Sequence, residues 1–191
     1  MKIGIYGGTF DPIHNGHLRV VVELLTRKVV DQIILVPAGA PQLRQNPPKA
    51  DGPTRLQMCN LAIADLPKEL KHQVLVSDIE INRAGPSFAI DTVNEIKGDS
   101  SKHEYFWIIG SDAYEKIDQW HRANELKELV SFIVIDRPSN TGDAGDVSDS
   151  SDGLDIGALD ISATQIRSDK SVHGVSPSVR KFIIERKLYA S

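Results

Sequence analysis

The chain has 191 residues, of which 40% are hydrophobic and 25% are charged, and its formal net charge is −4. These values predict a globular protein with a single domain over residues 1–191. The negative charge argues against a protein that mainly binds nucleic acid, and the single cysteine excludes an internal disulfide. No signal peptide precedes the first predicted strand and no apolar run is long enough to cross a bilayer, so we expect a cytoplasmic protein without a membrane partner.

Predicted strands and helices alternate along the chain. Apolar runs of strand length occupy residues 2–6, 32–36, 74–77, 105–109, 132–135 and 159–161. Apolar residues at helical spacing are found from near residue 17 and in 53–66, 87–96, 123–130 and 177–188. This alternation predicts an α/β fold, a Rossmann-like open parallel sheet with helices on both faces and a C-terminal helical segment.

The first predicted strand ends at Gly7 and Gly8, and the next helix begins near His17. The first amides of a helix favour an anion, and adjacent glycines let one approach the backbone. His14 and His17 are three residues apart, so both can reach a phosphate held at the first helical turn. The glycine spacing fits neither the dinucleotide fingerprint nor the P-loop. A zinc site on the two histidines would need further ligands, and none is apparent, so we predict no metal cage.

Residues 42–53 are rich in Pro, Gly and polar residues and predict a mobile loop. The loop carries Arg44 and Lys49, either as ordinary surface cations or as nucleotide contacts.

Two later segments add candidate site residues at predicted helix starts. Ser87 is a plausible N-cap, and its helix could receive a second anion. Asp112 follows Gly110 at the carboxyl edge of the sheet, where open parallel sheets bind ligands. Asp112 either caps its helix or lies near a ribose or a metal ion. Trp120 lies near a helix junction, where its pattern favours packing.

The last third of the chain contains a segment of unusual amino-acid composition and a helix with a predicted N-cap. Residues 139–153 are rich in Ser, Gly and Asp and have hardly an apolar side chain, which predicts a flexible acidic insertion. Ser162 can cap the following helix. Thr164 and Arg167 face the same way from its first turn and supply hydroxyl and guanidinium donors.

The segment GGTFDPIHNGH resembles the opening of the nucleotidylyltransferases that carry a His-x-Gly-His signature, and ISATQIR resembles their second signature, Ile-Ser-x-Thr-x-x-Arg. The PAG-x-P loop, GPSFAIDT, IIGSDAYEKIDQW and Arg137-Pro138 lie between them in the same order as in the bacterial nicotinate-mononucleotide adenylyltransferases. This resemblance covers nearly the full length. It implies an enzyme of NAD biosynthesis that transfers AMP from ATP to nicotinate mononucleotide, giving deamido-NAD and pyrophosphate.

The resemblance also implies roles for individual residues. The implied catalytic residues are His14, His17 and Arg167. The implied ATP contacts are Gly7, Gly8, Thr9, Phe10, His14, His17, Gly110, Asp112, Ser162, Thr164 and Arg167. The implied acceptor contacts are Arg44, Ala89, Trp120, His121 and Arg137. In the family two backbone amides, here those of Ala89 and His121, hold the nicotinate carboxylate, and a tryptophan ring, here Trp120, stacks on the pyridine.

Two departures from the family pattern fall in these segments. Pro41-Gln42-Leu43-Arg44 stands where the family has Pro-Pro-His-Lys, and Phe88-Ala89 stands where the family commonly has Tyr-Thr.

The two implied backbone contacts bear on the choice of acceptor. Backbone N–H donors suit a carboxylate better than a carboxamide, which is partly a donor itself. We therefore expect the acid mononucleotide to be preferred over the amide.

The reaction that the resemblance implies needs little chemistry from the protein. The acceptor phosphate is already an anion, so catalysis can consist of alignment and charge neutralisation, with Mg²⁺ carried on ATP.

Three alternatives to this function stay open. One is a pantetheine-phosphate adenylyltransferase, a more distant one is a cytidylyltransferase, and one of another class is a non-catalytic nucleotide sensor. The sequence also leaves a homo-oligomer open.

Overall fold

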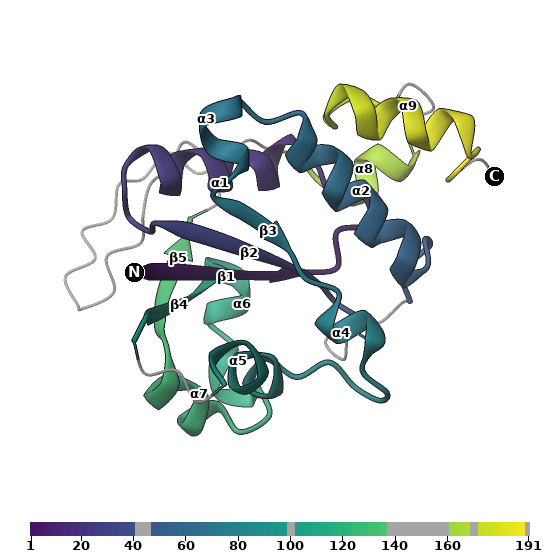
Figure 1. Ribbon diagram of the computed structural model, residues 1–191. Coiled ribbons are helices and arrows are strands. Elements are labelled where there is room, and N and C mark those ends of the chain that lie inside the picture. The colour runs from purple at the N-terminus through teal and green to yellow at the C-terminus, as the bar shows by residue number, and fades with distance from the viewer. Residues whose placement is uncertain (41–46, 99–101, 137–160, 169–171, 190–191) are drawn as a thin grey trace, which may run out of the picture.

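The computed structural model describes residues 1–40, 47–98, 102–136, 161–168 and 172–189 (Figure 1). Within these residues the strands form one parallel sheet in the order β3-β2-β1-β4-β5. The strands are β1 (Lys2–Gly8), β2 (Gln32–Pro37), β3 (Val74–Val76), β4 (Glu104–Gly110) and β5 (Ser131–Ile135). The predicted open parallel sheet is confirmed. β1 is its central strand, and the strand order reverses between β1 and β4, where ligands of such sheets bind.

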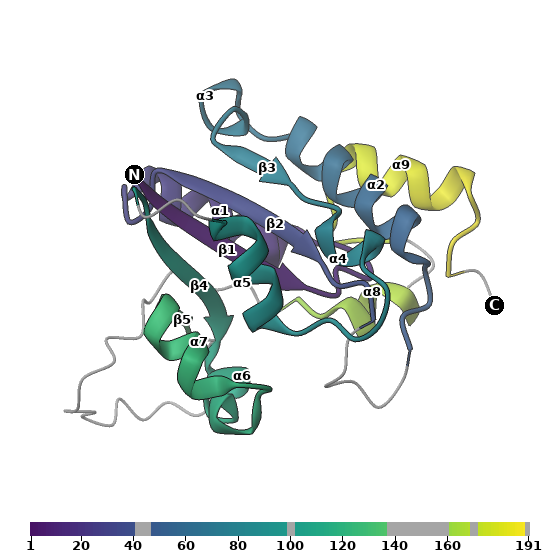
Figure 2. The same ribbon diagram turned by 60° about the horizontal axis from the view of Figure 1, so that its bottom comes forward.

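Helices cover both faces of the sheet (Figures 1 and 2). One face carries α1 (Asn15–Thr26), α2 (Gly52–Ala64), α3 (Lys68–Lys71), α8 (Ala163–Ser168) and α9 (Pro177–Glu185). The other carries α5 (Ala89–Lys97), α6 (Ser111–Tyr114), the 3-10 helix η1 (Ile117–Gln119) and α7 (Ala123–Leu129). The short α4 (Ile79–Asn82) follows β3. The helices on both faces confirm the predicted Rossmann-like layering.

Two apolar cores hold these layers together. On the first face, Leu24 of α1 and Met58 of α2 pack in one cluster with Leu35 of β2. On the second face, Val93 of α5 packs in another cluster with Trp107 of β4. A strand buried on both faces needs apolar residues at consecutive positions, which accounts for the unbroken runs in β2 and β4.

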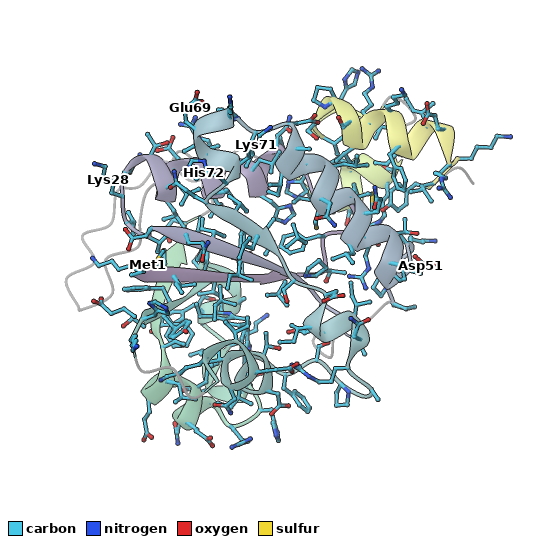
Figure 3. All side chains as sticks on the ribbon, viewed as in Figure 1. Met1, Lys28, Asp51, Glu69, Lys71 and His72 are labelled. Atoms are coloured by element: carbon cyan, nitrogen blue, oxygen red, sulfur yellow. The ribbon has the colours of Figure 1, made fainter. Side chains whose placement is uncertain are left out.

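The site lies at the end of the molecule where the strands finish. Met1 and Lys28 lie at the end where β1 and β2 begin, and Asp51 lies at the opposite end (Figure 3). Asp51 is the N-cap of α2, and its side chain accepts the Thr54 backbone N–H at 2.8 Å. The helix therefore begins inside the predicted loop 42–53, and only part of that loop lies within the described residues.

Several boundaries differ from the sequence prediction. α3 and α4 were not predicted, because four residues are too few to show a helical period. The start and middle of the predicted strand 159–161 lie outside the described residues, and Ile161 is not in a strand. The acidic segment 139–153 also lies outside them. Ser87 is not an N-cap, because α5 begins after Phe88.

Candidate active site

The turn between β1 and α1 brings two histidines together. His14 is the N-cap of α1, and its backbone N–H donates to Nδ1 of His17 at 3.2 Å. The two imidazole rings are stacked, with centroids 3.7 Å apart and planes inclined by 30°. Because Nδ1 of His17 accepts this hydrogen bond, the proton of the neutral ring is on Nε2. His17 therefore offers Nε2 as a hydrogen-bond donor.

Gly7 and Gly8 make room for aromatic rings. A Cβ on Gly7 would lie 2.8 Å from Cζ2 of Trp107, and a Cβ on Gly8 would lie 2.8 Å from Cζ of Phe10. We expected these glycines to let an anion approach the backbone. Protein rings fill the space in the direction of a Cβ, but both glycines also line an open cavity, so the approach of an anion to their backbone stays a prediction.

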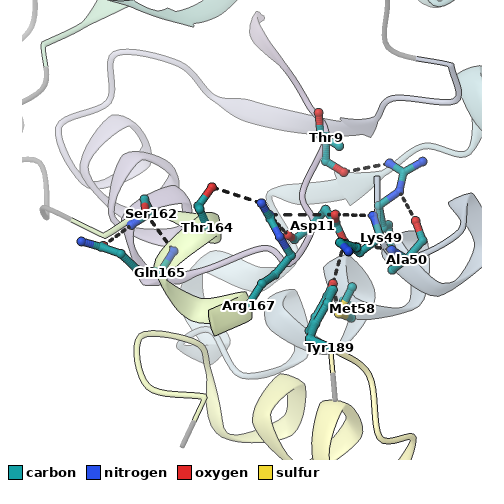
Figure 4. A network of polar contacts seen from close by, with 11 residues as sticks. Thr9, Asp11, Lys49, Ala50, Met58, Ser162, Thr164, Gln165, Arg167 and Tyr189 are labelled. Atoms are coloured by element: carbon teal, nitrogen blue, oxygen red, sulfur yellow. Dashed lines mark hydrogen bonds and ion pairs between the residues drawn. The ribbon is translucent and has the colours of Figure 1, made fainter. Parts of the chain in front are cut away.

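The helix α8 carries the second predicted motif. The hydroxyl of Ser162 accepts the Gln165 backbone N–H at 3.2 Å, which confirms the predicted cap. Nη2 of Arg167 donates to Oγ1 of Thr164 at 3.1 Å, so these two side chains do lie on one surface (Figure 4).

A hydrogen bond joins the two motifs. Nη1 of Arg167 donates to the backbone carbonyl of Asp11 at 2.7 Å, across 156 positions of the sequence. The turn that carries the two histidines and the hydroxyl–guanidinium pair therefore meet at Asp11 (Figure 4).

A cavity of about 590 Å³ opens beside this site, at the carboxyl ends of β1 and β4. Its walls include Gly8, Gly110 and three of the residues expected to contact the acceptor, Ala89, Trp120 and His121. The Trp120 ring meets Trp107 edge to face, with centroids 6.2 Å apart and planes inclined by 89°. The His121 ring stacks on Phe88 at 4.2 Å. The cavity is thus an aromatic slot suited to a flat ring.

The cavity also contains polar groups. The indole Nε1 of Trp120 is buried and has no hydrogen-bond partner among the described residues. Glu80 is 5% exposed and lines the wall, and its carboxylate accepts the Thr92 hydroxyl at 2.6 Å.

A family model described as cytidylyltransferase-like matches residues 5–176. The chain belongs to the cytidylyltransferase-like family. A Bacillus subtilis relative named nicotinate-nucleotide adenylyltransferase is 35% identical over 195 residues, which cover 100% of this chain and 99% of the relative. A Bacillus pumilus relative has the same identity and the same coverage. This cytidylyltransferase-like chain is accordingly a nucleotidyltransferase.

Solved structures share the fold of this family member. A Plasmodium falciparum nicotinic acid mononucleotide adenylyltransferase complexed with NaAD aligns with a TM-score of 0.76 and 21% identity, over 98% of this chain and 97% of that one. The same Plasmodium enzyme complexed with APC aligns with a TM-score of 0.70 and 20% identity, over 98% and 96% of the two chains.

Some predicted site residues of this nucleotidyltransferase cannot be placed, and one is reinterpreted. Arg44 and Arg137 lie outside the described residues. Asp112 is exposed, and the N-cap of α6 is Gly110, so the capping role considered for Asp112 is wrong. Lys49 contributes a backbone N–H, which donates to Asp11 at 2.8 Å.

Arg55 is a site residue that the sequence analysis missed. It is 1% exposed on α2 and donates from Nη1 to the Thr9 carbonyl at 2.8 Å and from Nε to the Ala50 carbonyl at 3.1 Å. Burial lowers the pKa of Arg55, and the nearby Asp11 carboxylate opposes that shift. The sequence feature that could have indicated its burial is its position four residues before Cys59, which places both residues on the same face of α2.

In the ranges that the structure describes, no group of three or more His, Cys, Asp or Glu residues is arranged to hold a metal ion. No helix of those ranges is long and apolar enough to span a membrane. Cys59 is fully buried, and burial raises the pKa of its thiol.

Proposed function

We propose that this protein is a nicotinate-nucleotide adenylyltransferase, which transfers AMP from ATP to nicotinate mononucleotide and releases pyrophosphate. The product is deamido-NAD, an intermediate of NAD biosynthesis. The observation that carries the proposal is the hydrogen bond from Arg167 to the Asp11 carbonyl. It brings the two nucleotidylyltransferase motifs to one site beside an aromatic cavity. The full-length similarity to the Bacillus subtilis relative of that name supports it.

The ATP side of the site works by positioning and charge. Nε2 of His17 donates to the triphosphate, and the N–H groups of Arg167 not used on Asp11 and Thr164 offset the charge that develops during transfer. The attacking group is the phosphate of the mononucleotide, which is already anionic. The site therefore needs no general base and no covalent intermediate.

The acceptor side is the aromatic cavity. The pyridine ring lies against Trp120, and its carboxylate accepts hydrogen bonds from the backbone amides of Ala89 and His121. Ala89 is the first residue of the nine-residue helix α5, where unpaired amides and the helix dipole favour an anion. A carboxamide would place its own NH₂ against one of these donors, so this cavity selects the acid. Contacts from Arg44 and Arg137 remain predictions.

Magnesium enters on the triphosphate in this proposal. The described residues gather no carboxylate cluster that would fit a resident ion, so we assign Mg²⁺ no protein ligand and no step. We also propose that the enzyme acts in the cytoplasm on free nucleotides.

The decisive experiment compares acceptors. Purified protein is incubated with ATP, magnesium and either nicotinate mononucleotide, nicotinamide mononucleotide or phosphopantetheine, and pyrophosphate release is measured. We expect the acid to exceed the amide in kcat/KM by at least about tenfold, because the amide leaves one of the two backbone donors unpaired. Product from phosphopantetheine alone would establish the alternative adenylyltransferase. A preference for the amide would refute the roles of Ala89 and His121.

A further inference from the structure

Asp11 forms a buried polar hub beside the histidine turn (Figure 4). The residue is 2% exposed, and its carboxylate accepts three hydrogen bonds. Oδ2 accepts the Lys49 backbone N–H at 2.8 Å, and Oδ1 accepts the Ala50 backbone N–H at 3.1 Å and the Tyr189 hydroxyl at 2.7 Å. A buried carboxylate needs such donors, because its desolvation is otherwise costly.

The same residue fixes Arg167 through its main chain. Nη1 of Arg167 donates to the Asp11 carbonyl at 2.7 Å, whereas its distance to Oδ2 of the carboxylate is 3.9 Å. A bidentate ion pair between the guanidinium and the carboxylate would have N–O distances of about 2.7–2.9 Å. Such a pair would occupy the same two N–H donors of the guanidinium that can bind a phosphate. The Asp11 carboxylate is held short of that pairing by the three donors that already bind it.

Tyr189 supplies one of these donors from the other end of the chain. It follows α9, and its hydroxyl also lies 4.0 Å from Sδ of Met58 on α2. Burial raises the pKa of Tyr189, and the hydrogen bond to Asp11 raises it further. The hydroxyl therefore stays protonated, and a donor, across the pH range in which the enzyme works.

We propose that Tyr189 is a positioning residue for the ATP triphosphate. By occupying one acceptor site of the Asp11 carboxylate, its hydroxyl keeps that carboxylate on the Lys49 and Ala50 amides and away from the guanidinium of Arg167. The remaining donors of Arg167 then face the phosphates. Without the hydroxyl, the carboxylate turns toward Arg167 and competes with ATP for it. This inference rests on the proposed function only in taking ATP as the ligand.

The test is Tyr189→Phe, which removes the hydroxyl and keeps the ring. Isothermal titration with ATP and magnesium, without acceptor, should show binding weakened by about tenfold, the scale of one charge-assisted hydrogen bond. The KM for nicotinate mononucleotide should stay unchanged, because the cavity does not contact Tyr189. The matched control is Tyr105→Phe, which removes a hydroxyl at the opposite end of the sheet, where Tyr105 pairs with Ile3. This control should leave both values unchanged.

A double-mutant cycle separates this role from general loosening. If Tyr189 acts through the Asp11 carboxylate, adding Tyr189→Phe to Asp11→Asn changes the ATP affinity by less than about twofold. An unchanged ATP affinity in Tyr189→Phe, an equal loss of affinity for both substrates, or a full tenfold loss on top of Asp11→Asn would each overturn the proposal. A wild-type protein that binds ATP but forms no deamido-NAD would refute the proposed function alone.

Discussion

The backbone N–H of His14 orients the imidazole ring of His17. The His14 N–H occupies Nδ1 and directs the remaining ring proton to Nε2, the atom that we expect to contact the triphosphate. His17→Ala should lower the rate of pyrophosphate release by about 10²–10³-fold, the range for losing one donor to a developing charge. The circular dichroism spectrum should stay that of the wild type.

A matched control for His17 is His72→Ala. His72 is exposed beside α3, on the far side of the molecule from Asp51 and the site (Figure 3). Its removal should leave the rate unchanged. An active His17→Ala enzyme would remove this imidazole from the mechanism, and a protein that binds ATP without any turnover in the wild type would instead be a nucleotide sensor.

Gly7 and Gly110 give opposite predictions for the same change. In Gly7→Ala the new methyl group meets the Trp107 ring at 2.8 Å, and we expect the free energy of unfolding to fall by about 1–3 kcal/mol, as for other overpacked cores. In Gly110→Ala no atom lies within 4 Å of the new carbon, so stability should be unchanged. Urea unfolding of both variants measures the difference, and equal stabilities would contradict the packing around Gly7.

Contacts between residues that are close in the sequence could be predicted better than contacts between residues that are distant in the sequence. Thr164 and Arg167 are three positions apart, and their contact could be predicted from helical spacing. Arg55 and Tyr189 act on the turn after β1 only because the tertiary fold brings them there. Ser87 was misassigned for the same reason, since its hydroxyl accepts the Gly39 and Ala40 backbone N–H groups at 3.0 Å instead of capping α5.

At the scale of elements, a carboxylate ties the C-terminal helix to the body of the protein. Asp65, the C-cap of α2, accepts the Ser178 backbone N–H at 2.8 Å and its hydroxyl at 2.6 Å, at the start of α9. Burial acts to raise the pKa of Asp65, but the hydrogen bonds from Ser178 outweigh it, and the pKa is lowered. The link between α2 and α9 is therefore strongest when Asp65 is ionised.

Asp65→Asn tests this link. At pH 7 we expect a loss of about 1 kcal/mol in the free energy of unfolding, because the site is exposed and water competes. A lowered pKa in the folded protein stabilises it above the ordinary value of 3.8, and that contribution is lost as the pH falls below it. The difference from wild type should therefore shrink between pH 7 and pH 3. Asp118→Asn, at an exposed pair with Lys127, should show no such change, and a pH-independent difference would contradict the assignment.

Whether a helix or strand could be predicted from the sequence depended on the length of its apolar pattern. The buried strands and the longer helices were found because their runs are long enough to show a period of two or of 3.6 residues. α3 and α4 were missed because they have four residues each, and neither has the apolar stripe of a packed helix.

At the scale of the whole molecule, a hydrogen bond joins segments from the two ends of the chain. Each described strand finishes at the edge where the turn after β1 lies, and Arg167 of α8 reaches that turn although most of the chain separates the two. The alternation of strands and helices predicts the parallel sheet. The lateral order, with β1 in the centre, depends on how the strands pair and became known only from the structure.

A structure with a non-hydrolysable ATP analogue and nicotinate mononucleotide bound is the most direct test of the proposed site. We expect the triphosphate to lie within hydrogen-bond distance of both Nε2 of His17 and the guanidinium of Arg167, with the pyridine ring against Trp120. A triphosphate that contacts only one of the two motifs, or that binds away from the turn after β1, would contradict it.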